Sequence, residues 1–203
     1  MQQKNESMTE QIEQTEQTEQ TEQTEQQIEQ NEQDICYMRE ALAEAQKALD
    51  MGEVPIGAVM VRAGAIIARG HNMRNTAKNP LRHAEIDVIN AAAEIVGDWR
   101  LEDCVLYVTV EPCPMCAGAI VQARIPKVVF GTRNSKAGCA GSVLDVLNEP
   151  KLNHQVDVVE GVLQPECSEI MKRFFKRFRK NAADTACTAN TDNTAHATPI
   201  SSH

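Results

Sequence analysis

The sequence has no apolar run approaching the roughly 20 residues that a bilayer span needs, and its first residues lack the apolar core of a signal peptide. It contains an odd number of cysteines, seven, and only one C-x-x-C pair, Cys113 and Cys116. The lack of a second pair weakens the case for a closed structural zinc site. We therefore expect a cytoplasmic protein with no membrane partner, a setting in which close cysteines more often bind metal than form a disulfide.

Positive charge is scarce, with 20 Lys and Arg against 29 Asp and Glu, a net charge of −9. Residues 1–33 hold nine Glu and one Lys, a net charge of −8, so the rest of the chain carries only −1. The acidic total therefore does not exclude an RNA partner, because only local patches of charge decide that.

Both ends of the chain offer little to bury. Residues 1–33 contain the polar repeat EQTEQTEQTEQTEQ, and residues 181–203 are rich in Ala, Thr, Asn and Ser. Such segments cannot offset the entropy cost of ordering their backbone. We predict disordered tails at 1–33 and 181–203 around one folded domain at 34–180, a size that suits a single domain.

Helical and strand patterns alternate between the tails. Helices are predicted at 34–50 (with Asp34 as a possible N-cap), 83–96, 113–123 and 166–180. A hairpin is predicted at GAVMV–RAG–AIIARG, a polar loop at 71–82, and further strands at CVLYVTV, KVVFG and VDVVEG. We assign Trp99, the only tryptophan, to core packing. The alternation predicts an α/β fold, a three-layer sandwich whose strand order the periodicity does not give.

Cys113 and Cys116 lie at a predicted helix start that follows a buried strand. Three residues apart, they share a helix face, and the unpaired N–H groups and the dipole at a helix start stabilise thiolates. Pro112 and Pro114 suit this position, because proline lacks an N–H that would be unpaired. Two thiolates can chelate zinc at about 2.3 Å. Alone, the pair is equally compatible with redox chemistry or with half of a structural zinc site.

His83 and Glu85 stand at another predicted helix start. A single histidine there is more often a cap or a core residue than a ligand, but Glu85 two places on can reach the same cleft. His83 and the two cysteines make three ligands and leave the fourth tetrahedral position for water, as in catalytic zinc sites. Zinc lowers the pKa of such water from about 15.7 towards roughly 7, and Glu85 is placed to move its proton. The joint pattern H-x-E, strand, P-C-x-x-C is the signature of zinc-dependent nucleobase deaminases.

Residues from about 38 to 180 resemble bacterial tRNA-specific adenosine deaminases of the cytidine-deaminase superfamily. The resemblance rests on VPIGAVMV, HAEI, YVTVEPCPMCAGAI, RIPKVVFGTRNSKAGCAGS, LNHQVDVVEGVL and ECSEIMKRFFKRFRK. It implies an α/β/α sandwich of the cytidine-deaminase type with a central mixed sheet. It also implies one Zn2+ per subunit on His83, Cys113 and Cys116, no organic cofactor, Glu85 as the proton shuttle, and Asn72 as a residue that holds the target nucleoside.

The same resemblance implies the reaction and the partners. Activated water attacks C6 of adenine, Glu85 protonates ring N1 and ammonia leaves, so that adenosine becomes inosine. The target base must leave its stack, which costs least in a single-stranded loop. A tRNA anticodon stem-loop meets this need, and the family implies the wobble position of tRNA-Arg. The family also implies a homodimer, with residues of both subunits around the RNA loop.

Asn134 stands where many members of the family carry Asp. A neutral amide repels nearby phosphate less than a carboxylate does and offers a donor as well as an acceptor. We therefore predict looser discrimination of the backbone sugar than in the relatives that carry Asp.

The segment KRFFKRFRK, residues 172–180, carries six basic residues interleaved with Phe174, Phe175 and Phe178. We predict that the phenylalanines lie on the buried side of the closing helix. In the simpler interpretation, the charges of this amphipathic helix are only solvated. In the second interpretation, Lys176 and Arg177 also contact tRNA phosphates.

Two alternatives remain open. EPCPMC and GAI also occur in guanine deaminases, so a deaminase of a free base or nucleoside, such as guanine or cytosine, fits the zinc motif. The stretch after Phe130 and the basic closing helix favour the tRNA enzyme. The non-enzyme alternative is a structural zinc module that binds RNA, for which Glu85→Ala would keep zinc and fold with no catalysis to lose.

Overall fold

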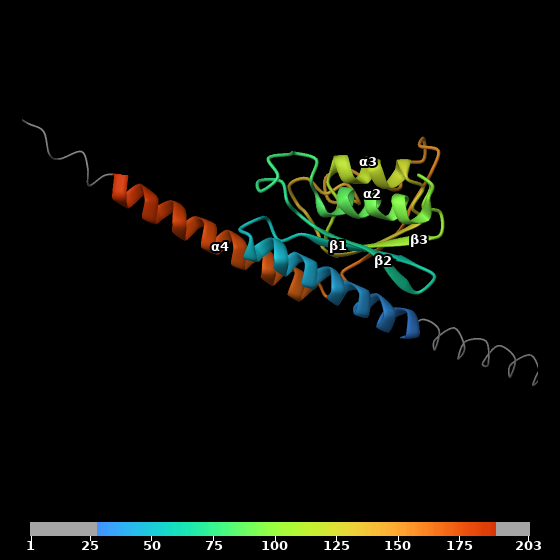
Figure 1. Cartoon of the computed structure of the whole chain (residues 1–203), viewed down its shortest axis with the longest axis horizontal. Helices are drawn as coiled ribbons and strands as arrows, with labels where there is room; N and C mark the ends of the chain where they lie inside the picture. Colours follow the sequence, from blue (N-terminus) through green and yellow to red (C-terminus); the bar gives the residue numbers. More distant parts are fainter. Residues whose placement is uncertain (1–27, 190–203) are drawn as a thin grey trace, which may run out of the picture.

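The structure, a computed structural model, describes residues 28–189 and shows a sheet covered by helices on both faces (Figure 1). After an N-terminal helix at residues 28–50, the elements are β1 (Gly57–Arg62), β2 (Ala65–His71), α2 (Ala84–Val96), β3 (Cys104–Val110), α3 (Pro114–Gln122), β4 (Lys127–Thr132), β5 (Asp157–Glu160) and α4 (Gln164–Ala189). Within this described part, no helix has both the length and the apolar character needed to cross a bilayer.

At both ends of the predicted domain, 34–180, helix extends beyond the predicted limit. Residues 28–33 already belong to the N-terminal helix, and residues 181–189 continue α4. Both extensions prolong helices that pack on the sheet, so a polar composition does not end them. The remainder of the predicted tails, 1–27 and 190–203, lies outside the described residues.

The strands form one mixed sheet with the order β2-β1-β3-β4-β5. Strand β1 is antiparallel to β2 and β3, whereas β3, β4 and β5 are parallel. The turn between β1 and β2 consists of Ala63 and Gly64, with φ of 49° and 76°, and two positive φ values give a turn whose twist matches a tight hairpin. The predicted hairpin and mixed sheet are confirmed.

Successive strand residues pack into two different cores, because side chains alternate between the faces of a sheet. Met60 and Phe130 belong to the core that includes residues of α2 and α3, whereas Val59 and Val129 pack with Met38 of the N-terminal helix. Figure 1 shows α2 and α3 on one side of the sheet and the N-terminal helix and α4 on the other. The three-layer prediction is confirmed, and burial on both faces explains why the inner strands are almost continuously apolar.

Asp34 does not cap the N-terminal helix, because that helix already contains residues 28–33. Its buried carboxylate accepts a hydrogen bond from the Tyr107 hydroxyl at 2.7 Å and lies 3.5 Å from Lys127 Nζ. Burial, and then this hydrogen bond, raises the pKa of Tyr107 well above its ordinary value. Asp34 therefore ties the helix to the sheet.

The N-terminal helix lies so close to β1 that Gly57 has no room for a side chain. A Cβ at this position would lie 2.1 Å from Ala41 O and 2.2 Å from Ala45 N. Glycine therefore allows a direct approach of helix backbone to strand. This contact fixes the helix whose C-terminal end supplies a residue of the site described below.

The topology brings several chain segments to one edge of the sheet. Strands β3 and β4 are parallel, and their ends pair as Val110 with Thr132. Strand β1 runs the other way, so it begins at this edge, where Gly57 pairs with His71 at the end of β2. Ligand sites of α/β folds form at the carboxyl ends of parallel strands. The loops that begin here carry the motifs that the sequence singled out.

Candidate active site

His83 is the N-cap residue of α2. Its backbone is extended, with φ −90° and ψ 151°, and its carbonyl accepts a hydrogen bond from the Asp87 N–H at 3.0 Å. Its side chain makes no capping hydrogen bond. The imidazole is therefore available to face the two cysteines, as the predicted helix start requires.

Cys113 occupies the same position at α3, with φ −77° and ψ 173°, and Pro114 follows it in the first helical turn. The N–H groups at the start of a helix lack partners inside the helix, and they favour negative charge. Cys116 lies one turn further on and is fully buried. Both sulfurs therefore stand where a thiolate is stabilised.

The three candidate ligand atoms form a nearly equilateral triangle. Cys113 Sγ lies 3.6 Å from Cys116 Sγ and 3.7 Å from His83 Nδ1, and Cys116 Sγ lies 3.6 Å from His83 Nδ1. A tetrahedral zinc ion, with bonds of about 2.3 Å to sulfur and about 2.0 Å to nitrogen, requires about 3.8 Å between the sulfurs and about 3.5 Å from sulfur to nitrogen. The side chains therefore fit zinc. Among residues 28–189, no fourth side chain joins the group, so a coordination position remains for solvent.

Protons are shared unequally within this triangle. A hydrogen bond from Cys116, and then one from His83, lowers the pKa of Cys113 to about 4. The same contact with Cys113, together with burial, raises the pKa of Cys116, and the contact with Cys113 also raises that of His83. A bound dication favours the deprotonated form of every ligand, so these three side chains suit a metal ion.

Glu85 lies on the first turn of α2 and is only 3% exposed. Within the described part of the chain, its Oε2 is the one buried side-chain oxygen or nitrogen without a hydrogen-bond partner. Burial raises the pKa of this carboxyl above its ordinary value. Leaving such an atom without a partner costs about 1–3 kcal/mol. A carboxyl held in this way beside a metal site is suited to exchange protons with a bound substrate or solvent molecule.

Asn72, the predicted contact to the nucleoside, is buried at the end of β2, and its partner Glu53 is a residue that sequence reasoning did not select. Asn72 Nδ2 donates to Glu53 Oε2 at 3.2 Å, and the Thr76 N–H donates to Glu53 Oε1 at 2.5 Å. Glu53 is fully buried. Its only signal in the sequence is a charge placed directly before an apolar strand.

Asn134 begins the loop that follows β4, and the buried Glu111 organises this loop. The Asn134 N–H donates to Glu111 Oε2 at 2.8 Å, and the Ala140 N–H donates to Oε1 at 2.9 Å. Asn134 Oδ1 accepts from the N–H groups of Lys136 at 3.3 Å and Ala137 at 3.2 Å. The amide of Asn134 thus stabilises its own turn, and Glu111, which stands in the cysteine motif, is a second residue whose role the sequence did not show.

A pocket of about 400 Å³ opens beside Asn134, between the ends of β3 and β4 and helix α4. Phe175 lines it and is 47% exposed, so the prediction that this ring is buried is wrong. Phe174 is the ring that packs with Ile170 against the N-terminal helix, while the side chain of Phe178 lies outside the described part. Phe175 therefore borders an open pocket, on the side of α4 that the sequence predicted to be buried.

Lys176 and Arg177 directly follow Phe175 on α4, and both are exposed. Neither lines the pocket beside Asn134 nor belongs to the metal group. Their contact with RNA therefore stays a prediction, for residues of a helix that borders the pocket beside Asn134.

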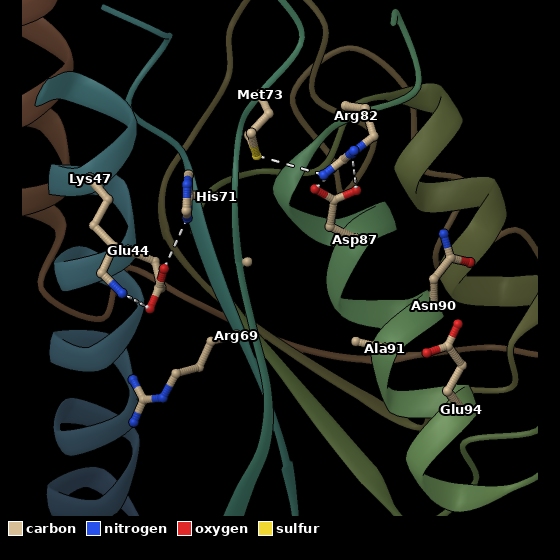
Figure 2. Close-up of a pocket in the computed structure, with 11 residues that line it drawn as sticks. Glu44, Lys47, Arg69, His71, Met73, Arg82, Asp87, Asn90, Ala91 and Glu94 are labelled. Atoms are coloured by element: carbon tan, nitrogen blue, oxygen red, sulfur yellow. Dashed lines mark hydrogen bonds and ion pairs between the residues drawn. The ribbon is translucent and has the colours of Figure 1, made fainter. Parts of the chain in front are cut away.

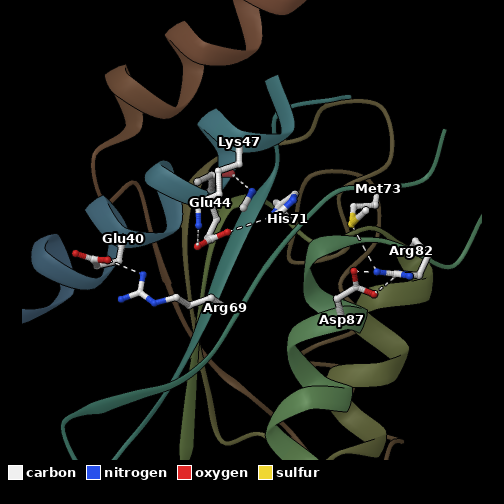
Figure 3. Close-up of polar contacts among 10 residues, drawn as sticks. Glu40, Glu44, Lys47, Arg69, His71, Met73, Arg82 and Asp87 are labelled. Carbon is white, nitrogen blue, oxygen red and sulfur yellow. Dashed lines mark hydrogen bonds and ion pairs between the residues drawn. The ribbon is translucent and has the colours of Figure 1, made fainter. Parts of the chain in front are cut away.

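A second pocket, of about 520 Å³, lies between the N-terminal helix, β2 and α2 (Figure 2). His71 points into it, with Nδ1 3.0 Å from Glu44 Oε2, and Lys47 Nζ lies 2.7 Å from Glu44 Oε1 (Figure 3). Arg82 donates to Asp87 at 2.8 Å on the α2 side of the same pocket. His71, the last residue of β2, thus contacts the N-terminal helix through Glu44, whereas Asn72 contacts Glu53.

Known proteins match this chain closely. Residues 31–179 match the family of MafB19-like deaminases. A tRNA-specific adenosine deaminase of Bacillus subtilis (strain 168) is 53% identical over 148 residues, which cover 73% of this chain and 92% of the relative. A tRNA-specific adenosine deaminase of Aquifex aeolicus (strain VF5) is 43% identical over 145 residues, covering 71% of this chain and 95% of the relative. The chain belongs to the tRNA-specific adenosine deaminase family.

Solved structures agree with this membership of the tRNA-specific adenosine deaminase family. One from studies of A-to-I editing by tRNA:A34 deaminases at the wobble position has a TM-score of 0.64 and 42% identity, covering 66% of this chain and 97% of that one. The chain is thus an enzyme, a hydrolytic deaminase, as the sequence predicted. A guanine deaminase of Nitrosomonas europaea shares the fold, with a TM-score of 0.62, 18% identity and coverage of 69% of this chain and 83% of that one. At that identity, the likeness concerns the fold and not the substrate.

Proposed function

We propose that this enzyme converts adenosine to inosine at the wobble position of a tRNA anticodon, with tRNA-Arg as the expected substrate. The observation that carries the proposal is the triangle of His83, Cys113 and Cys116 beside the unpartnered oxygen of Glu85. The names of relatives that are 53% and 43% identical support the choice of tRNA and adenosine. A tRNA substrate also supports the expected cytoplasmic location.

His83, Cys113 and Cys116 would hold one zinc ion per subunit. When bound, zinc supplies Lewis acidity that makes a water molecule nucleophilic near neutral pH. Glu85 accepts one proton from this water and delivers it to N1 of adenine. It then takes the remaining proton from the oxygen now bonded to C6 and passes it to the leaving amino group. A C6–O bond forms, the C6–N6 bond breaks, and ammonia leaves, so adenosine and water become inosine and ammonia.

Four other residues are proposed to bind the RNA. Asn72 contacts the target nucleoside, and Asn134 lies on the loop that borders the 400 Å³ pocket, which suits a polynucleotide that enters along α4. Lys176 and Arg177 extend the same path with exposed positive charge that can neutralise phosphates. A homodimer, proposed from the family, would place a second subunit beside this path.

The test is incubation of the purified protein with an anticodon stem-loop that carries adenosine at the wobble position, with inosine as the measured product. We expect inosine from the wild type and a loss of about 10²- to 10⁴-fold for Glu85→Ala, because that variant lacks the proton shuttle. Zinc content, measured in both proteins, should stay near one per chain, which separates loss of the shuttle from loss of the metal site. Rapid turnover of free guanine with the stem-loop untouched would refute the proposal.

A further inference from the structure

The turn that ends the N-terminal helix places the side chain of Glu53 next to that of Asn72. The Gly52 N–H donates to Leu49 O at 3.0 Å, and the Glu53 N–H donates to Ala48 O at 2.9 Å. With φ of 77° at Gly52, these two bonds make the Schellman motif that commonly ends helices. Side chains after such a motif are usually apolar, but here a fully buried carboxylate follows it.

Both oxygens of Glu53 are used as acceptors. Oε2 accepts from Asn72 Nδ2 at 3.2 Å, and Oε1 accepts from the Thr76 N–H at 2.5 Å. An ionised carboxylate can only accept hydrogen bonds, so the amide of Asn72 must turn its nitrogen towards Glu53. The backbone N–H of Asn72 donates to Ile56 O at 3.0 Å. This bond fixes the backbone at Asn72 and so limits the directions that its side chain can take. Asn72 Oδ1 is therefore left facing away from Glu53.

We propose that Glu53 is a positioning residue for substrate binding. It orients the amide of Asn72 so that Oδ1 is presented as an acceptor to an O–H or N–H donor of the target nucleoside. Through Thr76 it also holds the turn that leads to His83. The inference rests on the proposed function, because it assumes that Asn72 contacts the nucleoside, and it goes further by fixing which end of the amide makes that contact.

The decisive variant is Glu53→Gln, which keeps the size of the side chain. The Thr76 N–H retains the remaining oxygen, so the new NH2 group faces the NH2 group of Asn72. Two donors repel each other, and Asn72 must reverse its amide. We expect kcat/KM on the stem-loop to fall about 10- to 100-fold, with zinc content unchanged, because the NH2 group of Asn72 then faces the donor of the nucleoside, and a buried donor left unpaired has a cost of this magnitude.

The double variant Glu53→Gln with Asn72→Asp tests orientation directly. It has the same net charge as the wild type, and the amide at position 53 can donate to the carboxylate at position 72, whose other oxygen again faces the substrate as an acceptor. We expect recovery of kcat/KM to within several-fold of the wild type. Asn72→Asp alone should be inactive or nearly so, because two buried carboxylates then face each other.

Glu44→Gln is the matched control, since Glu44 is a buried carboxylate of the helix that precedes Glu53, with His71 and Lys47 as its partners. Asn72→Asp should give no rescue in that background. A double variant no more active than Glu53→Gln would overturn the proposal, as would equal rescue of Glu44→Gln.

A measurement without catalysis separates this inference from the proposed function. The side-chain amide protons of Asn72, observed by NMR, should shift on Glu53→Gln, and hydrogen exchange of the turn at residues 73–82 should rise in Glu53→Ala but not in Glu53→Gln. If the variants show these changes but the wild type forms no inosine, the proposed function alone is refuted. A wild type that forms inosine, with the Asn72 amide unaffected by Glu53→Gln, would refute the positioning role alone.

Discussion

Replacing Glu111 by glutamine should destabilise the enzyme by about 1.5–3 kcal/mol or more, without any change in side-chain size. Oε2 accepts from the Asn134 N–H at 2.8 Å and from the Ser142 hydroxyl, and Oε1 accepts from the N–H groups of Ala140 at 2.9 Å and Ser142 at 3.0 Å. Glutamine turns one of these oxygens into an NH2 group. In the Oε2 position this group conflicts only with the Asn134 N–H, because the Ser142 hydroxyl can rotate to accept from it. At least one charge-assisted hydrogen bond is then broken, so the expected loss is about 1.5–3 kcal/mol or more.

The surrounding backbone leaves the glutamine side chain no room to move away from the donor that it faces. A Cβ at Gly138 would lie 2.2 Å from Glu111 Oε2, so the loop is already packed against the carboxylate. The side chain at position 111 is only 2% exposed, and water cannot freely replace the missing partners. A loss of this size is a large part of the about 5–15 kcal/mol by which folded proteins exceed their unfolded state.

Acid should reproduce part of the effect in the wild type. Burial raises the pKa of Glu111, but the hydrogen bonds from Ser142, Asn134 and Ala140 outweigh it and hold the pKa below the ordinary value of 4.5. Since the folded-state pKa is the lower one, the stabilisation is present above pH 4.5 and is lost as the pH falls through the folded-state pKa. Glu111→Gln should lack this part of the acid transition.

Urea unfolding at pH 7 with saturating zinc measures the difference, and Ser142→Ala serves as a control. That variant removes the hydroxyl donor but keeps the three backbone donors, so it should cost only about 1–2 kcal/mol. A Glu111→Gln protein within about 1 kcal/mol of the wild type would refute the assignment of Glu111 as the acceptor that holds the loop.

Three further changes have defined outcomes. Gly57→Ala should lower the urea midpoint, because its Cβ would lie 2.1 Å from Ala41 O and overpacking costs about 1–3 kcal/mol or more; an unchanged midpoint would contradict the close approach of helix and strand. Neutral replacements of Lys176 and Arg177 should reduce the salt dependence of RNA binding by up to about one unit of log–log slope for each phosphate that is no longer neutralised, and an unchanged slope would assign both residues to solvent. Asn134→Asp should increase discrimination between matched RNA and DNA hairpins, and equal selectivity of the two proteins would remove the predicted effect of the amide.

Local patterns predicted the elements better than they predicted exposure. The starts of α2 and α3 at His83 and Cys113 were predicted, because a cap and a following proline act within one turn of helix. Trp99, assigned to the core, is instead 59% exposed, and the guanidinium of Arg100 lies 5.3 Å from the centre of its ring. Hydrophobicity alone gave the wrong burial for Trp99 and Phe175, because it does not show which side chains are covered by other helices or strands.

The sequence by itself determined the group of three candidate metal ligands, His83, Cys113 and Cys116, and the carboxyl of Glu85 beside them. C-x-x-C and H-x-E each place two side chains on one helix start, and only a sheet is needed to bring those starts together. What the tertiary structure alone decided is the support around them, namely the contacts of Glu53 with Asn72 and of Glu111 with the loop after β4. These contacts join segments that are distant in the chain and obey no periodicity. They exist because β1, β3 and β4 end or begin at one edge of the sheet, where a buried carboxylate must find donors from whichever loops lie there.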